Sequence, residues 1–115
     1  MEAISKRCWT LDTARALFGE VRERTAAAVQ EVDELLAERE QHAADAPERQ
    51  ALDERIQKLI SRWIRGMEAL GLEVKGLWLV DFDNGEGYYC WRWPEEKLEY
   101  FHGYDEGFAG RTRIQ

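Results

Sequence analysis

The chain of 115 residues has little cysteine and no long apolar run, and each shortage excludes a class of protein. Its two cysteines, Cys8 and Cys90, lack the spacing of a zinc knuckle, a redox pair or a disulfide framework, so we expect reduced thiols. No stretch approaches the roughly 20 apolar residues that a membrane-spanning helix needs. The segment Met1–Arg7 is mixed and polar, unlike a secretory signal. We therefore expect a soluble, cytoplasmic protein without a membrane partner.

Positive charge is also in short supply. The chain has 16 Lys and Arg against 23 Asp and Glu, a formal net charge of −7. Because nucleic acids attract proteins with a surplus of Lys and Arg, we expect no nucleic-acid partner. Charged residues make up 34% of the chain and apolar ones 44%, which suits long helices with one solvated face. The length is about that of one ordinary domain, so we expect residues 1–115 to form a single domain.

The first half of the chain predicts an antiparallel helical hairpin over about residues 10–70. Thr10 is a typical helix N-cap, and from there apolar residues recur at alternating intervals of three and four. A turn follows, with Asp45 expected as the next cap and Pro47 in the first turn of the second helix. That helix is expected to end at Gly71, which suits a left-handed backbone. The two apolar stripes are Leu11, Ala14, Phe18, Val21, Thr25, Ala28, Val32 and Leu35, then Leu52, Ile56, Leu59, Trp63, Met67 and Leu70.

The second half predicts a small antiparallel sheet of three strands over about residues 77–103, so the fold class is α+β. The runs 77–82 and 88–93 are β-branched and aromatic and flank Asn84-Gly85, the strongest short hairpin signal. With these two residues at the centre of a type I′ turn, Leu79 is expected opposite Cys90. One face then carries Val80, Tyr89, Trp78, Trp91 and Trp93, and the other carries Asp81, Tyr88, Leu79, Cys90 and Arg92.

The third strand, about 98–102, has two expected registers. Cys90 lies opposite Phe101 in one of them and opposite His102 in the other, and a slip of one residue moves every side chain to the other face. Residues 104–115 then form an irregular, glycine-rich loop, which we expect to fold back over the sheet through Tyr104 and Phe108.

Several short motifs occur in an order typical of one known family. They are a Trp-Thr-Leu helix start, Gly71–Lys75, Leu79–Phe82, Tyr89–Arg92, Tyr100–His102 and Asp105–Arg111. In these motifs the chain resembles the bacterial domain-of-unknown-function family 2203, nearly from end to end. The family often has Glu three residues after the capping Thr, where this chain has Thr13, which puts the reciprocal capping box in doubt. The family has no established activity, so the resemblance implies a bacterial cytosolic setting and no mechanism.

Seven residues carry candidate ligand-binding chemistry: Asp81, Cys90, Arg92, Glu99, His102, Asp105 and Arg111. Cys90 suits core packing, and it could act as a nucleophile only with His102 beside it. His102, Asp105 and Glu99 match no standard metal site, so neither a metal nor a cofactor is expected. Arg92 and Arg111 could bind an anion, although a cross-strand ion pair between Arg92 and Glu99 is the simpler interpretation.

The favoured function is a non-enzymatic binding or assembly module that acts through self-association of the hairpin. Four apolar residues lie beside the main stripes and widen the apolar surface: Val29, Leu36, Ile60 and Ile64. An isologous homodimer that forms a four-helix bundle would cover them, and a higher homo-oligomer or another protein partner are related solutions. Alternatively, the aromatic residues of the sheet cover them within one chain. The competing hypothesis is an anion-binding or small-molecule-binding protein, or a small enzyme, that uses the face with Cys90, Arg92, His102 and Asp105.

Overall fold

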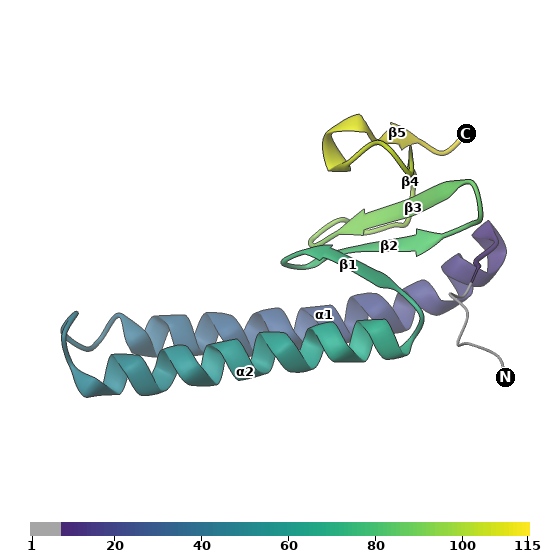
Figure 1. Ribbon diagram of the computed structural model, residues 1–115. Coiled ribbons are helices and arrows are strands. Elements are labelled where there is room, and N and C mark those ends of the chain that lie inside the picture. Colours follow the sequence, from purple (N-terminus) through teal and green to yellow (C-terminus); the bar gives the residue numbers. More distant parts are fainter. Residues whose placement is uncertain (1–7) are drawn as a thin grey trace, which may run out of the picture.

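The computed structural model describes residues 8–115 and combines two long antiparallel helices with one antiparallel sheet (Figure 1). Met1–Arg7 lie outside the described residues, and so does the expectation that they are no secretory signal. The elements are α1 Leu11–Arg39, α2 Pro47–Ala69, β1 Glu73–Gly76, β2 Leu79–Asp83, β3 Gly87–Arg92, β4 Tyr100–Gly103, the short 3₁₀ helix η1 Phe108–Gly110, and β5 Thr112–Arg113. Among residues 8–115, no helix is both long and apolar enough to cross a bilayer.

Local chemistry explains where the helices begin and end. The Thr10 hydroxyl accepts a hydrogen bond from the Thr13 backbone N–H at 3.0 Å, and the Thr13 hydroxyl accepts one from the Thr10 N–H at 2.9 Å. Thr13 thus closes a capping box without the usual Glu. The expected cap at Asp45 is wrong. Pro47 occupies the first position of α2, so Ala46 directly before it is the N-cap, and its methyl side chain makes no hydrogen bond. Gly71 ends α2 with φ of 95°, as predicted.

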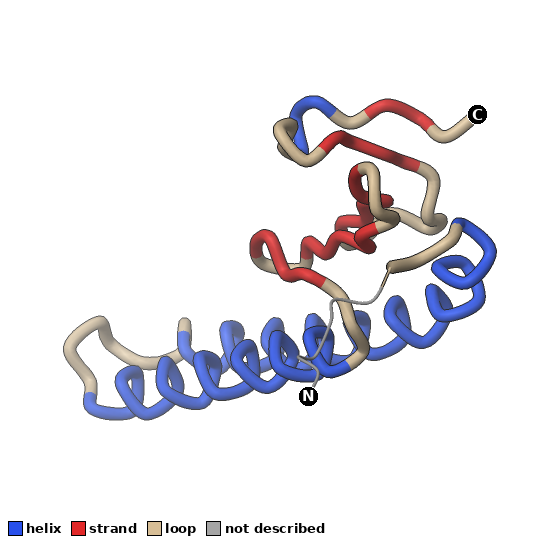
Figure 2. Tube along the Cα trace, turned by 45° about the vertical axis from the view of Figure 1, so that its right-hand side comes forward, coloured by secondary structure: helices blue, strands red, loops and turns tan. Residues whose placement is uncertain are grey.

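The sheet packs over one half of the helical hairpin, and the other half extends beyond it. Figures 1 and 2 both show the turn between α1 and α2 far from the strands. The contact layer is aromatic: the ring centroids of Phe18 and Trp91 are 5.4 Å apart, and those of Trp63 and Trp78 are 4.8 Å apart. The core consists of Trp9, Ala14, Val21, Ala28, Trp63, Met67, Leu72, Val80, Phe82, Trp91 and Leu98. We call the uncovered half of the hairpin the projecting half.

The sheet has five strands in the order β1-β2-β3-β4-β5, so the prediction of three strands is wrong. The two unpredicted strands, β1 and β5, lie at the edges. Strand β1 has four residues and an irregular register with β2, and β5 has only two residues. Edge strands that are short and irregular leave little alternation in the sequence, and for that reason the pattern did not reveal them.

The turn between β2 and β3 is also longer than predicted. Within this turn only Gly85 has a positive φ, whereas a type I′ turn requires a positive φ at Asn84 as well. Instead, the Asn84 side chain accepts hydrogen bonds from the backbone N–H groups of Glu86 and Gly87, both at 2.8 Å. Cys90 consequently lies opposite Asp81 and not opposite Leu79, a shift of two residues. Because side chains alternate with a period of two, every predicted face assignment on β2 and β3 still holds.

Neither expected register of the next strand is observed. Cys90 lies opposite Tyr100, and Tyr88 lies opposite His102. This register differs by two residues from the expected pairing of Cys90 with His102, so His102 does share a face with Cys90. The three adjacent strands therefore bring Asp81, Cys90 and His102 together on one face.

Candidate functional site

The outer face of the sheet is the face opposite Val80, Phe82 and Trp91, which pack into the core. Along β2, apolar Val80 and Phe82 point inward, so Asp81 between them points outward. Cys90 of β3 and His102 of β4 join it on this face. Their relative exposures are 1% for Asp81, 1% for Cys90 and 3% for His102, although aspartate and histidine side chains usually stay near water. We call these three residues the outer-face cluster.

The ligand atoms of the outer-face cluster, one from each residue, all lie within 4.8 Å of one another. His102 Nε2 is 2.9 Å from Asp81 Oδ2, and His102 Nδ1 is 2.9 Å from the backbone oxygen of Gly103. A carbonyl oxygen only accepts hydrogen bonds, so Nδ1 carries a proton. Asp81 Oδ1 is buried and has no hydrogen-bond partner among the described residues. The cluster is thus a compact polar site with one unsatisfied acceptor.

Electrostatics around the cluster argue against a reactive thiolate. Burial raises the pKa of the Cys90 thiol to about 12; the nearby Asp81 carboxylate adds to this rise, and Arg111 opposes it. A cysteine nucleophile needs a lowered pKa, which requires a dominant positive partner. In this arrangement the thiol stays protonated at neutral pH.

The C-terminal segment packs back against the sheet, mainly through polar contacts. Arg111 forms two bonds with the Glu95 carboxylate, at 3.0 and 2.7 Å, and its guanidinium lies 4.1 Å from the Tyr100 ring centroid and 3.9 Å from that of Phe108. The Tyr104 hydroxyl donates to Asp83 at 2.6 Å. The rings of Tyr104 and Phe108 stay partly exposed, so their apolar burial contributes less to this fold-back than predicted.

Of the remaining predicted site residues, Arg92, Glu99 and Asp105 do not join the outer-face cluster, whereas Arg111 lies beside Cys90. Glu99 pairs with Arg113 at 2.9 Å, so the expected ion pair between Arg92 and Glu99 is wrong. The Arg92 guanidinium lies 5.3 Å from the ring centroid of Phe108. Asp105 is exposed in the turn that follows β4.

Sequence reasoning missed two neighbours of the cluster. Lys75 Nζ lies 3.7 Å from Asp81 Oδ2 and 4.1 Å from the ring centroid of Tyr88. Glu95 holds Arg111 beside Cys90. Lys75 could have been found only from β1, whose two-residue alternation is too short to stand out, and Glu95 only from the packing of the C-terminal segment.

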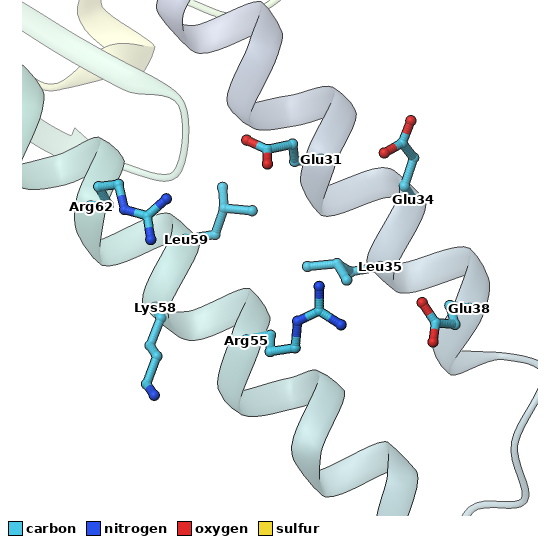
Figure 3. Close-up of a pocket in the computed structure, with 8 residues that line it drawn as sticks. All are labelled: Glu31, Glu34, Leu35, Glu38, Arg55, Lys58, Leu59 and Arg62. Atoms are coloured by element: carbon cyan, nitrogen blue, oxygen red, sulfur yellow. The ribbon is translucent and has the colours of Figure 1, made fainter.

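A second surface of interest lies on the projecting half of the hairpin. A groove of about 390 Å³ runs between α1 and α2 there, with Leu35 and Leu59 between the helices (Figure 3). Its α1 side carries Glu31, Glu34 and Glu38, which we call the acidic row, and its α2 side carries Arg55, Lys58 and Arg62, which we call the basic row. Among the described residues, no ion pair joins the two rows within one chain.

The four apolar residues expected beside the main stripes are only partly covered. Val29, Ile60 and Ile64 are half-buried, and Ile64 packs against the core. Leu36 stays 42% exposed on the projecting half. Cover within one chain therefore accounts for part of this surface, on the half of the hairpin that carries the sheet.

A family model described as "Uncharacterized conserved protein (DUF2203)" matches residues 7–114. A search of curated proteins found no match. A search of solved structures found none either.

Proposed function

The chain belongs to the DUF2203 family, and because that family's description names no activity, we propose a function from the chain's own surfaces. The protein is a non-enzymatic, cytosolic assembly module that forms a homodimer through the projecting half of its hairpin. One observation carries this proposal: opposite charges are separated on the two sides of a single groove, and they are not paired with each other within the chain.

The two rows match each other in spacing. Glu31, Glu34 and Glu38 follow intervals of three and four, as do Arg55, Lys58 and Arg62, so each row forms a straight stripe on its helix. Each stripe extends over about 10 Å at about 1.5 Å per residue. Such equal and opposite stripes form a self-complementary surface, which is the requirement for an isologous contact between two copies of one chain.

Charge also selects one geometry for this contact. In a twofold arrangement whose axis runs along the helices, the acidic row of each copy lies over the basic row of the other. An axis across the helices would instead place acidic row on acidic row and basic row on basic row, which is repulsive. We therefore infer a dimer with both sheets at the same end, in which two hairpins form a four-helix bundle.

The sheet leaves room for this arrangement. The groove continues from the projecting half into the half that carries the sheet, where a hollow of about 330 Å³ is also lined by Glu31, Leu59 and Arg62. Because this continuation is open, the sheet covers a different side of the helix pair. The two sheets of the inferred dimer consequently do not compete for the groove.

The competing hypothesis, an enzyme or anion-binding protein that uses the outer face, has less support. The thiol of Cys90 has a raised pKa, and the carboxylate of Glu95 neutralises Arg111. Asp105 lies away from the cluster, exposed to solvent. The named residues therefore supply no activated nucleophile, and of the two cations named for an anionic substrate Arg111 is already paired.

A pair of charge-reversed variants tests the proposed dimer. One variant carries Glu31→Lys, Glu34→Lys and Glu38→Lys, so that both of its rows are basic; the other carries Arg55→Glu, Lys58→Glu and Arg62→Glu, so that both are acidic. Each variant alone should be monomeric in size-exclusion chromatography with light scattering, because like charges meet across the twofold axis. An equimolar mixture should form a heterodimer.

A matched control separates this effect from a general change in net charge. Glu23→Lys, Glu48→Lys and Glu96→Lys change the charge by the same amount at exposed positions outside the groove, and this variant should dimerise like the natural chain. If the two groove variants stay monomeric when mixed, or if each still forms a homodimer alone, the groove is not the interface.

A further inference from the structure

We propose that the outer-face cluster of Asp81, Cys90 and His102 binds a divalent transition-metal ion such as Zn²⁺. The site is separate from the hairpin groove, and the proposal is independent of dimer formation. The sequence predicts no metal site from His102, Asp105 and Glu99. The proposed site instead combines His102 with Asp81 and Cys90.

The chemistry of the three residues suits such an ion. A carboxylate oxygen, a thiolate sulfur and an imidazole nitrogen are the ligand types that Zn²⁺ accepts in proteins. Here the three side chains come from three adjacent strands, which hold them on a rigid support, and their ligand atoms already lie within 4.8 Å of one another. Three protein ligands would leave one position of a tetrahedral ion for water or another ligand.

The hydrogen bond from His102 to Gly103 prepares the imidazole for a metal. Because Nδ1 donates to the Gly103 carbonyl at 2.9 Å, the neutral imidazole carries its lone pair on Nε2, which faces Asp81 Oδ2 at 2.9 Å. Two acceptors at that distance need a cation between them, either a proton or a metal ion. A backbone carbonyl that fixes the second ring nitrogen is also the usual support of a metal-binding histidine.

The second oxygen of Asp81 gives an independent indication. Oδ1 has no hydrogen-bond partner among the described residues, although Asp81 is only 1% exposed. A buried carboxylate oxygen without a partner destabilises the fold, and folded proteins rarely retain one without a compensating ligand. A cation coordinated by both oxygens of Asp81, beside Cys90 and His102, would satisfy it.

The surrounding charges are compatible with a divalent ion. The carboxylate of Asp81 and the thiolate of Cys90 together balance its two positive charges. The nearby cations already have acidic partners: Lys75 lies 3.5 Å from Glu73 and 3.7 Å from Asp81 itself, and Arg111 lies 2.7 Å from Glu95. On binding, the proton of the Cys90 thiol and the proton between His102 and Asp81 leave for solvent, because a coordinating thiol is deprotonated outright.

Cobalt(II) titration of the full chain tests this site, because a thiolate ligand gives Co²⁺ a charge-transfer absorption in the near ultraviolet. The chain has two cysteines and two histidines, so the variant Cys8→Ser/His42→Ala retains only Cys90 and His102 as thiolate and imidazole ligands. We expect this variant to bind one equivalent of Co²⁺ with the thiolate absorption, and we expect Zn²⁺ to displace the cobalt.

Ligand variants locate the site. In the same background, Cys90→Ser should abolish the charge-transfer absorption, and Asp81→Asn should weaken binding by at least about tenfold. Circular dichroism shows whether each variant remains folded. The proposal is overturned if folded Cys8→Ser/His42→Ala protein shows no saturable thiolate absorption, a result that needs no ligand variant to fold. It is also overturned if Cys90→Ser retains the absorption.

Discussion

Burial sets the chemistry of individual residues on the outer face of the sheet. Cys90 is a clear case, since the same thiol that a sequence pattern can present as a nucleophile is enclosed between strands beside a carboxylate. Its pKa rises from 9.0 to about 12 for that reason. Cys8 is exposed at the start of the described chain and provides an internal comparison.

We predict that the two thiols differ strongly in reactivity. In metal-free protein near pH 8, a disulfide reagent should modify Cys8 rapidly and Cys90 only at the rate of local or global opening, because the thiolate is the reactive form. Cys8→Ser should remove the fast phase and leave the slow one. Equal rates for both thiols in folded protein would contradict the buried position of Cys90.

The raised pKa of Cys90 also determines in which direction pH changes the stability of the fold. The folded state holds the thiol proton more tightly than the unfolded chain does, so this contribution to stability is fully present below pH 9.0 and is lost as the pH rises towards 12. The variant Cys90→Ala lacks this thiol. The loss of stability that thiol deprotonation causes at alkaline pH should therefore be absent from the variant.

At the scale of the elements, regular periodicity was readable from the sequence and register was not. The helical hairpin followed from apolar spacing, since intervals of three and four identify a buried stripe whatever packs on it. The faces of β2 and β3 followed from alternation. The register depended on the side-chain hydrogen bonds of Asn84, and the position of β4 depended on the path of residues 93–99, which no local pattern determines.

The difference between periodicity and register also explains which parts of the candidate site could be predicted from the sequence. Alternation placed Asp81, Cys90 and Arg92 on one face, and one of the two expected registers added His102 to it. Lys75 and Arg111 reach the cluster from β1 and from the C-terminal segment, so their roles depend on tertiary packing. Glu99 and Asp105 are close to His102 in sequence, but proximity in sequence does not bring side chains together across a turn.

Gly87 connects the register of the sheet to stability. A Cβ atom at this position would lie 2.6 Å from the backbone oxygen of His102 and 2.6 Å from the ring of Phe101. Backbone cannot move aside without breaking the pairing of β3 with β4, so we predict that Gly87→Ala destabilises the fold by about 1–3 kcal/mol in urea unfolding. Gly107→Ala is the matched control, because nothing lies within 4 Å of its Cβ. Equal stability of the two variants would contradict the observed register.

At the scale of the whole molecule, the fold divides into a part that is covered and a part that is not. The sheet and one half of the hairpin enclose the aromatic core, while the projecting half carries the acidic and basic rows beside the exposed Leu36. Among the described residues, no ion pair joins the two rows within the chain. In the proposed dimer, the second copy supplies the complementary rows.

Sedimentation equilibrium of the natural chain at two salt concentrations tests this central claim most directly. At micromolar protein and about 0.05 M NaCl we predict twice the chain mass of 13.5 kDa. At about 0.5 M NaCl the apparent mass should fall towards 13.5 kDa, because salt screens the contacts between the charged rows. A dimer held mainly by apolar contacts would keep its mass as salt rises. A mass of 13.5 kDa throughout the micromolar range at low salt would contradict the proposed assembly.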